Sequence, residues 1–187
     1  MASYQARRRD PLVDQKMQAA IERRGRELLG VMLVVMALLL GLMLASFSPS
    51  DPSWFAATDQ PVHNLLGSFG AAIAAPVYVI AGRGAWGIVL ILAFWGGRMV
   101  THRGEERAIS RAIFAPIAIA MMSATAATQE VGPGWEQSFG YGGLFGDTFL
   151  GSILGIVPAS GTVSLAMTSL LLAGLTLAMT LFVLGFD

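Results

Sequence analysis

The sequence predicts an all-α integral membrane protein with four transmembrane helices, two short helices at the outer face that are interfacial or re-entrant, and a parallel internal repeat. Hydrophobic residues make up 55% of the 187 residues and charged residues only 13%, whereas soluble domains carry about 25% charged residues. Several apolar stretches are long enough to cross a bilayer. The Lys and Arg residues gather in two of the segments between those stretches, which limits how many times the chain can cross.

The first predicted span covers residues 28–47, which read LLGVMLVVMALLLGLMLASF and contain one polar side chain, Ser46. About twenty helical residues cover the roughly 30 Å hydrocarbon core of a bilayer. A cleaved signal peptide fits less well, because 27 residues precede the stretch and the apolar core of a signal peptide has about 7–15 residues. We therefore expect residues 1–27 to form a basic cytoplasmic tail, to about Val13, and a helix that leads into an uncleaved span.

Two further spans are predicted at residues 112–128 and 162–184. Pro116 falls in the first turns of the former, where a missing backbone N–H is tolerated. The polar residues of the latter are Ser and Thr, whose hydroxyls bond to carbonyls of their own helix. Residues 64–100 are harder to assign, because they fit either two short spans or one span and a helix that does not cross.

The distribution of positive charge decides between these alternatives. Of the 12 Lys and Arg residues, 11 lie in residues 1–27 or 98–111. Basic residues in short loops stay in the cytoplasm, so an even number of crossings must separate the two segments. Residues 84–100 then form the second span and both chain ends are cytoplasmic. The outer loops 48–63 and 129–147 agree, because they carry acids but no Lys or Arg.

The segments before the second and fourth spans resemble each other. We expect each to form a short outer helix, at about residues 64–81 and 142–157, and matching residues recur at an offset of 76. Small residues on such helices let backbones approach closely in lipid. The chain thus contains two copies of one unit with an outward span, an acidic loop, a short helix and an inward span. The matched pairs are Gly67 and Gly143, Phe69 and Phe145, and Gly70 and Gly146. The predicted helix-packing residues are Gly67, Gly70, Gly143, Gly146, Gly151 and Gly155.

No catalytic, cofactor-binding or metal-binding residue is predicted. The chain has no cysteine and only two histidines, which disfavours a metal site. Residues 82–87, GRGAWG, match the dinucleotide pattern GxGxxG, but an apolar helix precedes them where that pattern requires a strand, so a glycine corner between helices is the better interpretation. The only lysine, Lys16, follows Gln15 and does not fit a phosphate-binding loop. An intramembrane serine hydrolase built on Ser68, with His63 nearby, is the weakest hypothesis.

Two charged residues near the predicted outer face need separate hypotheses. Arg83 is the only basic residue there, and we expect it to pair with an outer acid or to reach the lipid headgroups. Asp147 lies near the start of a predicted helix, where a negative charge suits the helix dipole. A structural role is therefore favoured for Asp147 over a functional one.

Several short motifs resemble the N-terminal four-span membrane domain of the FtsK/SpoIIIE-family DNA translocases. The most specific is the run Pro49–Trp54, PSDPSW, which follows the first span. Residues 142–161, GGLFGDTFLGSILGIVPASG, are similar to the family's segment before its fourth span, and the resemblance covers about residue 25 to the end. Further matching residues are Ser46, Phe47, His63, Asn64, Gly67, Gly70 and Ala71.

The resemblance implies a function that composition does not show. Proteins of this family are anchored at the bacterial division septum by such a domain, and their cytoplasmic hexameric ATPase pumps DNA during chromosome segregation. For this chain it implies a septum-targeting anchor in the inner membrane that acts in cell division and chromosome partition. No enzyme activity and no cofactor are expected, because the chain stops at Asp187 without the motor domain.

The expected partners are the lipid bilayer, further copies of the chain and division-site membrane proteins, with DNA only through the absent motor domain. The predicted partner-contact residues are Ser50, Asp51, Pro52, Ser53 and Trp54. The alternative function is a component of a small four-span transporter or channel. That alternative predicts a polar track through the spans, and no predicted span has a charged residue at its centre.

Overall fold

The computed structural model describes residues 15–102, 108–135, 137–156 and 161–186, and within these ranges the chain is helical with no strand. The predicted tail before Gln15 lies outside them. The elements in chain order are α1 (Gln15–Ala45), α2 (Gly67–Ala81), the 3-10 helix η1 (Gly82–Ala85), α3 (Trp86–Val100), α4 (Ala108–Ala127), α5 (Gly143–Ile156) and α6 (Gly161–Leu184).

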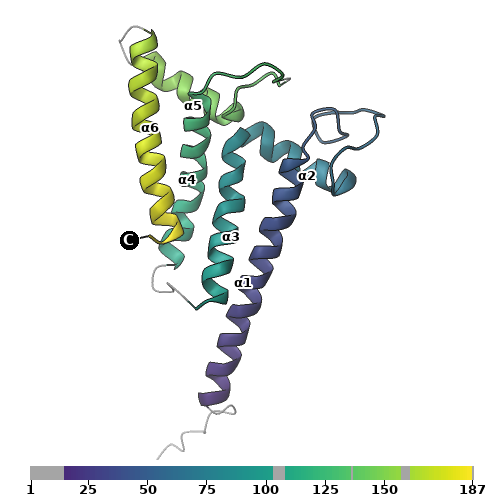
Figure 1. The fold of residues 1–187 in the computed structure, drawn as a ribbon, viewed down its shortest axis with the longest axis vertical. Coiled ribbons are helices and arrows are strands. Elements are labelled where there is room, and N and C mark those ends of the chain that lie inside the picture. The colour runs from purple at the N-terminus through teal and green to yellow at the C-terminus, as the bar shows by residue number, and fades with distance from the viewer. Residues whose placement is uncertain (1–14, 103–107, 136, 157–160, 187) are drawn as a thin grey trace, which may run out of the picture.

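The long helices α1, α3, α4 and α6 lie side by side in that order, and the shorter α2 and α5 lie across one end of the row (Figure 1). Helix α1 packs mainly against α3, and α4 packs mainly against α6. We call the end that carries α2 and α5 the cap end, and the end where α1 begins and α6 finishes the terminal end. Each half of the chain is therefore an antiparallel helix pair with a short helix across its cap end.

Four helical segments among the described residues are long and apolar enough to cross a membrane: Lys16–Ala45, Gly67–Val100, Ser110–Ala127 and Gly161–Leu184. The second segment combines α2, η1 and α3, and the chain turns at η1 so that α3 runs back along α1 (Figure 1). The four residues of η1 and the 15 of α3 together rise about 30 Å, enough for one crossing. The predicted all-helical fold class with four spans is confirmed.

Some helix ends differ from those predicted. Helix α1 runs from Gln15 to Ala45 without a break, so the lead-in helix and the first span are one element. It ends before residue 47 because the N–H of Phe47 donates to the Leu44 carbonyl at 3.3 Å, which tightens the last turn. Helix α4 begins at Ala108, earlier than the predicted residue 112.

The internal repeat is visible in the backbone as well as in the sequence. Gly67 and Gly143 begin α2 and α5 with positive φ angles of 63° and 68°, a conformation that favours glycine. Each donates its N–H three residues back, Gly67 to Asn64 at 2.8 Å and Gly143 to Gly140 at 3.1 Å. The match at an offset of 76 therefore reproduces the same turn into the same element.

The core of the described residues consists of three small clusters. One joins the cap end of α1 to α2 and η1 around Met43, Ala74 and Ala85. A second joins α4, α5 and α6 around Ala124 and Leu150. Each half thus has its own cluster beneath its short helix. The third joins α3, α4 and α6 and holds the halves together; its buried members are Ile91, Ala118, Val183 and Leu184.

Helices α1 and α3 approach most closely at two glycines that sequence analysis did not single out. A Cβ atom at Gly30 would lie 2.7 Å from the Gly96 carbonyl oxygen, and one at Gly96 would lie 2.6 Å from the Gly30 carbonyl oxygen. Only residues without a side chain permit this crossing, which is common among helices in lipid.

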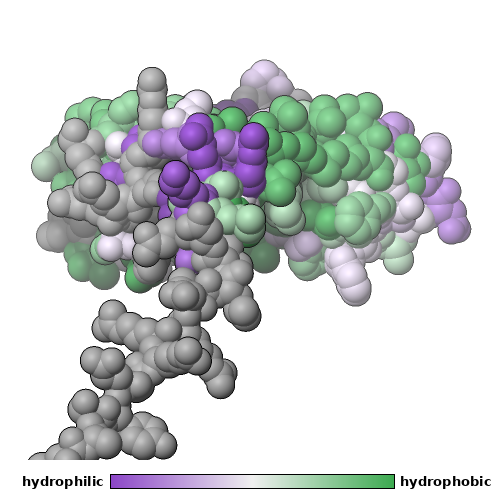
Figure 2. Space-filling model, turned by 90° about the horizontal axis from the view of Figure 1, so that it is seen from below, coloured by the Kyte–Doolittle hydropathy of each residue, from purple (hydrophilic) through white to green (hydrophobic). Residues whose placement is uncertain are grey.

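The sides of the helix row expose apolar side chains that suit a bilayer. The terminal end of the row also exposes polar side chains. Many large apolar side chains of α1 and α6 are exposed, among them Leu28, Leu38 and Leu170. Seen from the terminal end, hydrophilic side chains gather mainly in one group beside broad hydrophobic surface (Figure 2). Arg98 contributes at this end, because its Nη1 donates to the carbonyls of Leu184 and Gly185 at 3.3 and 3.2 Å and so caps α6.

Candidate functional site

The loop between α1 and α2 is closed by a buried acid. Asp51 is only 2% exposed, and its carboxylate accepts three hydrogen bonds from two residues on the far side of the loop. The N–H of His63 and the N–H of Asn64 donate at 2.8 and 2.9 Å, and Nδ1 of His63 lies 3.1 Å away. Hydrogen bonds to a carboxylate are stronger than those between neutral groups, so Asp51 fixes the shape of this loop.

Asn64 joins the loop to both neighbouring helices. Its Nδ2 donates to the carbonyls of Met43 and Ser46 at 2.8 and 3.4 Å, at the end of α1. Its Oδ1 accepts the N–H of Leu66 at 3.1 Å, just before α2. A Cβ atom at Gly70 would collide with this Oδ1, so glycine is required there. One buried amide therefore satisfies carbonyls left open by α1 and starts α2.

Ser46 completes this network, which we call the first cap. Its hydroxyl donates to the Leu42 carbonyl at 2.7 Å and accepts the N–H of Leu65 at 3.0 Å. The motif residues Ser46, Asp51, His63, Asn64 and Gly70 are thus neighbours in space although 24 positions separate the first from the last. Sequence reasoning missed the roles of His63 and Asn64, because the Asp51 partners lie 12 and 13 residues further on.

The predicted partner-contact residues divide into two kinds. Asp51 points inward and is engaged in the first cap, whereas Trp54 is 82% exposed. Ser50 is exposed as well, and Pro52 and Ser53 are partly buried. Phe55, which the sequence analysis did not include, is 62% exposed. The loop therefore exposes two large aromatic side chains on a backbone that an internal network fixes.

The two halves meet at a group of small residues, which we call the junction: Ala81, Gly82, Gly84, Ser123, Gly142 and Gly143. Ser123 is buried on α4, and its hydroxyl donates to the Ala81 carbonyl at 2.6 Å. A Cβ atom at Gly84 would lie 2.6 Å from the Ser123 nitrogen, and one at Gly142 would lie 2.5 Å from the Ser123 oxygen. A Cβ atom at Gly82 would collide with the backbone nitrogen of Gly143. The junction thus brings η1, α4 and the start of α5 into backbone contact.

Arg83 strengthens the junction in a way that neither sequence hypothesis included. Its N–H donates to the Tyr141 carbonyl at 2.8 Å. Its guanidinium lies 3.3 Å from the centroid of the Tyr141 ring and 6.0 Å from that of Trp135. The arginine therefore makes cation–π contacts with the loop of the other half.

Asp147 has a local structural role. Its Oδ2 accepts the N–H of Gly140 at 2.6 Å, so a side chain within α5 holds the loop that precedes α5. This contact accounts for an acid in an otherwise apolar helix, in agreement with the structural role that was favoured.

The predicted packing glycines differ in their surroundings. Cβ atoms at Gly70, Gly143 and Gly146 would meet neighbouring atoms at once, so these three permit close contacts within the chain. At Gly67, Gly151 and Gly155 no atom of the described neighbours lies within 4 Å of such a Cβ. Packing by Gly151 and Gly155 therefore stays a prediction about other copies of the chain.

The described cap end offers fixed loops with exposed aromatic residues. Among the described residues, no group of three His, Asp or Glu side chains could hold a metal ion. His63, the base that the hydrolase hypothesis would need for Ser68, is bonded to Asp51 through Nδ1, as an oriented base would be, so that hypothesis stays a prediction.

The fold defines a class of protein: a multi-pass helical membrane domain in which two similar helix pairs each carry a short helix and a fixed loop at one end. The chain belongs to the family whose model is described as the 4TM region of DNA translocase FtsK/SpoIIIE, which matches residues 22–186. The resemblance found in the sequence is thereby confirmed.

Curated relatives carry the same description. The chain is 30% identical over 145 residues to a protein named DNA translocase FtsK from Azospirillum brasilense, covering 76% of this chain and 23% of the relative. It is 33% identical over 134 residues to one of that name from Bradyrhizobium diazoefficiens, covering 72% and 16%. A third, from Caulobacter vibrioides, is 31% identical over 132 residues, covering 68% and 16%. The chain thus spans less than a quarter of the length of these relatives, and no solved structure matches it.

Proposed function

We propose that this chain is the membrane anchor that places a DNA translocase at the bacterial division septum. The observation that carries the proposal is the match of residues 22–186 to the membrane region of the translocase family. The chain contributes a multi-pass position in the inner membrane, and DNA work would belong to a motor domain joined to it. Holding several motors in one assembly would raise their local concentration. Further copies of this chain are therefore among its proposed partners.

The proposed orientation puts the terminal end in the cytoplasm and the cap end outside. Helices α1 and α6 have their free ends on the same side of the row (Figure 1). Arg83 is the basic residue of the cap end, whereas the described basic side chains of α1 and the Arg98 cap of α6 lie toward the terminal end. Positive side chains stay preferentially on the cytoplasmic side. A motor attached beyond α6 would then face the chromosome.

The exposed part of the first cap is the proposed contact surface for a division-site membrane protein. Trp54 and Phe55 are large, exposed and close together on a loop whose shape Asp51 fixes. Aromatic side chains dominate the binding energy of many interfaces. A loop that is already ordered loses little conformational entropy on binding. Asp51 shapes this surface from within, so replacing it would test the fold of the loop rather than the contact.

The test is a double variant, Trp54→Ala with Phe55→Ala, in the full-length translocase expressed in its host. We expect normal membrane insertion and protein level, with loss of septal localisation and a delay in division. The matched control is Leu170→Ala with Leu171→Ala, which removes apolar side chains that are similarly exposed on α6. Normal septal localisation and division in the aromatic variant would contradict the proposed contact.

A further inference from the structure

Helix α2 turns a face of large apolar side chains away from the rest of the described chain. Phe69 is 69% exposed and Ile80 is 53% exposed. Between these two residues the only polar side chain is that of Tyr78, whose ring stacks on that of Phe47 with 4.6 Å between the centroids. A helix face of this kind requires an apolar neighbour. The residues that α2 buries are small: Gly70, Ala71, Ala74 and Ala75.

Helix α2 also lacks the charged face of a helix that lies on a membrane surface. Interfacial helices of that kind keep a strongly polar face in water, usually with Lys or Arg on it. Helix α2 contains no charged residue and, beside Tyr78, one polar side chain, Ser68 in its first turn. The interfacial alternative for α2 is therefore disfavoured, and the alternative in which the helix enters the bilayer is favoured.

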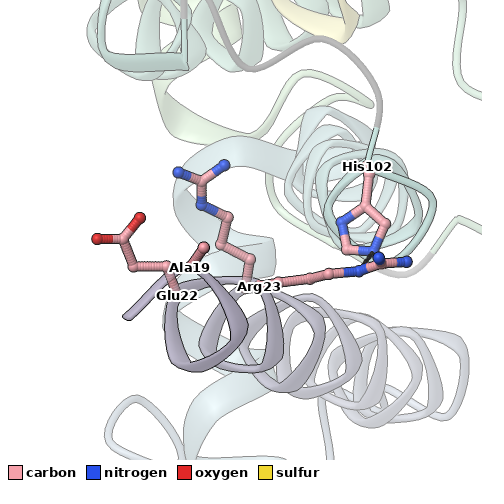
Figure 3. A pocket seen from close by; sticks show the side chains of 5 residues that line it. Ala19, Glu22, Arg23 and His102 are labelled. Carbon is pink, nitrogen blue, oxygen red and sulfur yellow. Dashed lines mark hydrogen bonds between the residues drawn. The ribbon is translucent and has the colours of Figure 1, made fainter. Parts of the chain in front are cut away.

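The charged side chains of α1 mark one boundary of the hydrocarbon layer. Figure 3 shows Glu22 and Arg23 on α1 at the terminal end, where Nε of Arg23 donates to Nε2 of His102 at 3.2 Å. The last charged residue of α1 is Glu27. The hydrocarbon therefore begins near Leu28, and its far boundary lies roughly 30 Å away, toward the cap end.

Helix α2 packs short of that far boundary. The apolar cluster that joins α1 to α2 includes Leu40 and Met43, which lie about 18 and 23 Å beyond Leu28 along the helix axis. A second measure follows α3 and η1 from Arg98 to Gly82, just after α2, a rise of about 26 Å. Both lengths are smaller than the roughly 30 Å of hydrocarbon, and a tilt of the helices shortens them further. Helix α2 thus lies at the depth of acyl chains.

Both ends of α2 have backbone groups bonded inside the chain, as a hydrocarbon environment requires. At the start, the N–H groups of Leu66 and Gly67 donate to the side chain and the carbonyl of Asn64, at 3.1 and 2.8 Å. At the end, the Ala81 carbonyl accepts the Ser123 hydroxyl at 2.6 Å. The first cap and the junction therefore supply hydrogen bonds that water would supply to a helix end outside the bilayer.

We propose that phospholipid acyl chains of the outer leaflet cover the exposed face of α2, so that α2 is embedded in the bilayer. Apolar side chains of α1 at about the same depth are exposed as well, Leu38 by 63% and Leu42 by 46%. Lipid that solvates α1 therefore reaches the level of α2. Between Phe69 and Ile80 the exposed face carries no charged group that could orient a protein partner. Only the choice of leaflet rests on the proposed orientation of the anchor.

The test places the photoreactive amino acid p-benzoylphenylalanine at Phe69 of the full-length protein in its host membrane. Illumination joins this side chain to whatever covers α2, and mass spectrometry identifies the product. We expect phospholipid adducts attached through the acyl chains, as at the control position Leu170 on the exposed face of α6. A second control, at the exposed Asp59 in the loop before α2, should give no such adduct. Adducts of residue 69 with another protein, and none with lipid, would overturn the proposal.

A second measurement labels Phe69→Cys in spheroplasts with a membrane-impermeant maleimide. A thiol among acyl chains stays protonated, so it should react about tenfold or more slowly than the thiol of Asp59→Cys, before and after permeabilisation. Equal labelling rates would place α2 in water and would overturn the proposal. Labelling of Asp59→Cys only after permeabilisation would contradict the proposed orientation instead, and lipid adducts at residue 69 would then still support a bilayer position for α2.

Discussion

Asp51 is the residue that fixes the shape of the loop after α1. Its place between two prolines predicts a tight turn, and the turn is present. Its burial was not predictable, because its partners are brought to it only when the ends of α1 and α2 come together. The most polar residue of the motif is therefore internal, whereas Trp54, which was predicted to contact a partner, is 82% exposed.

Replacing Asp51 by Asn should destabilise the first cap. The new side chain keeps the shape but turns an NH₂ group toward backbone N–H groups, so at least one buried donor loses its acceptor. We expect a loss of about 1–3 kcal/mol in the free energy of unfolding, measured as a lower melting temperature of the purified protein in detergent. Ser68→Ala, at an exposed position of α2, is the control and should leave the melting temperature unchanged. Equal melting temperatures for the Asn variant and the control would show that the buried carboxylate contributes little.

At the scale of elements, the two short helices are held by different means. Helix α2 is fixed to α1 by the side-chain network of the first cap. Helix α5 is fixed by close backbone contact at the junction and by its own Asp147. The repeat therefore preserves the turn at Gly67 and Gly143 while the contacts around it have diverged.

The junction makes Gly82 the most sensitive glycine for the contact between halves. Its φ angle is 55°, and a Cβ atom would collide with the Tyr141 carbonyl and the Gly143 nitrogen. Gly82→Ala should therefore cost about 3 kcal/mol or more, because backbone atoms cannot yield as a side chain can. The readout is the melting temperature in detergent.

The control for this change is Gly97→Ala in α3, where no described neighbour lies within 4 Å of the new methyl group. Alanine favours a helix over glycine by about 1 kcal/mol, so this variant should be neutral or more stable. Similar destabilisation by both changes would argue against a tightly packed junction.

The elements show where prediction from sequence succeeds and where it stops. Charge placement predicted one crossing and one short helix in residues 64–100, and the chain there forms two helices, α2 and α3, joined by η1. That α3 alone crosses the membrane stays a prediction. The glycine repeat located the short helices α2 and α5, but Gly67 and Gly143 were predicted as packing residues, and the structure places them at the turns that begin these helices, with positive φ angles. Gly30 and Gly96 were not identified, because their importance comes from a contact between helices whose crossing point no local pattern encodes. The aromatic contacts of Arg83 were not predicted for the same reason, since its partners lie more than 50 residues away.

At the scale of the whole molecule, the described helices form a row with short caps, and no single large core unites them. The three small clusters bury few large side chains, and Ala and Gly occupy most of the close contacts. In a bilayer the exposed apolar faces are solvated by lipid, so helix association depends on close packing and hydrogen bonds rather than on burial from water. This arrangement suits a membrane anchor.

The central claim, a four-span anchor with both chain ends in the cytoplasm, is tested most directly by cysteine accessibility. The 187 residues contain no cysteine, so a single cysteine introduced among them is labelled without a background from this part of the protein. Asp59→Cys and Glu130→Cys mark the two cap-end loops, and Arg24→Cys and Thr101→Cys mark the terminal end; all four positions are exposed.

In intact spheroplasts, a membrane-impermeant maleimide should label the cysteines at residues 59 and 130, and it should label those at residues 24 and 101 only after permeabilisation. Labelling of residues 59 and 130 from opposite sides of the membrane, or of residue 24 from outside, would contradict the account.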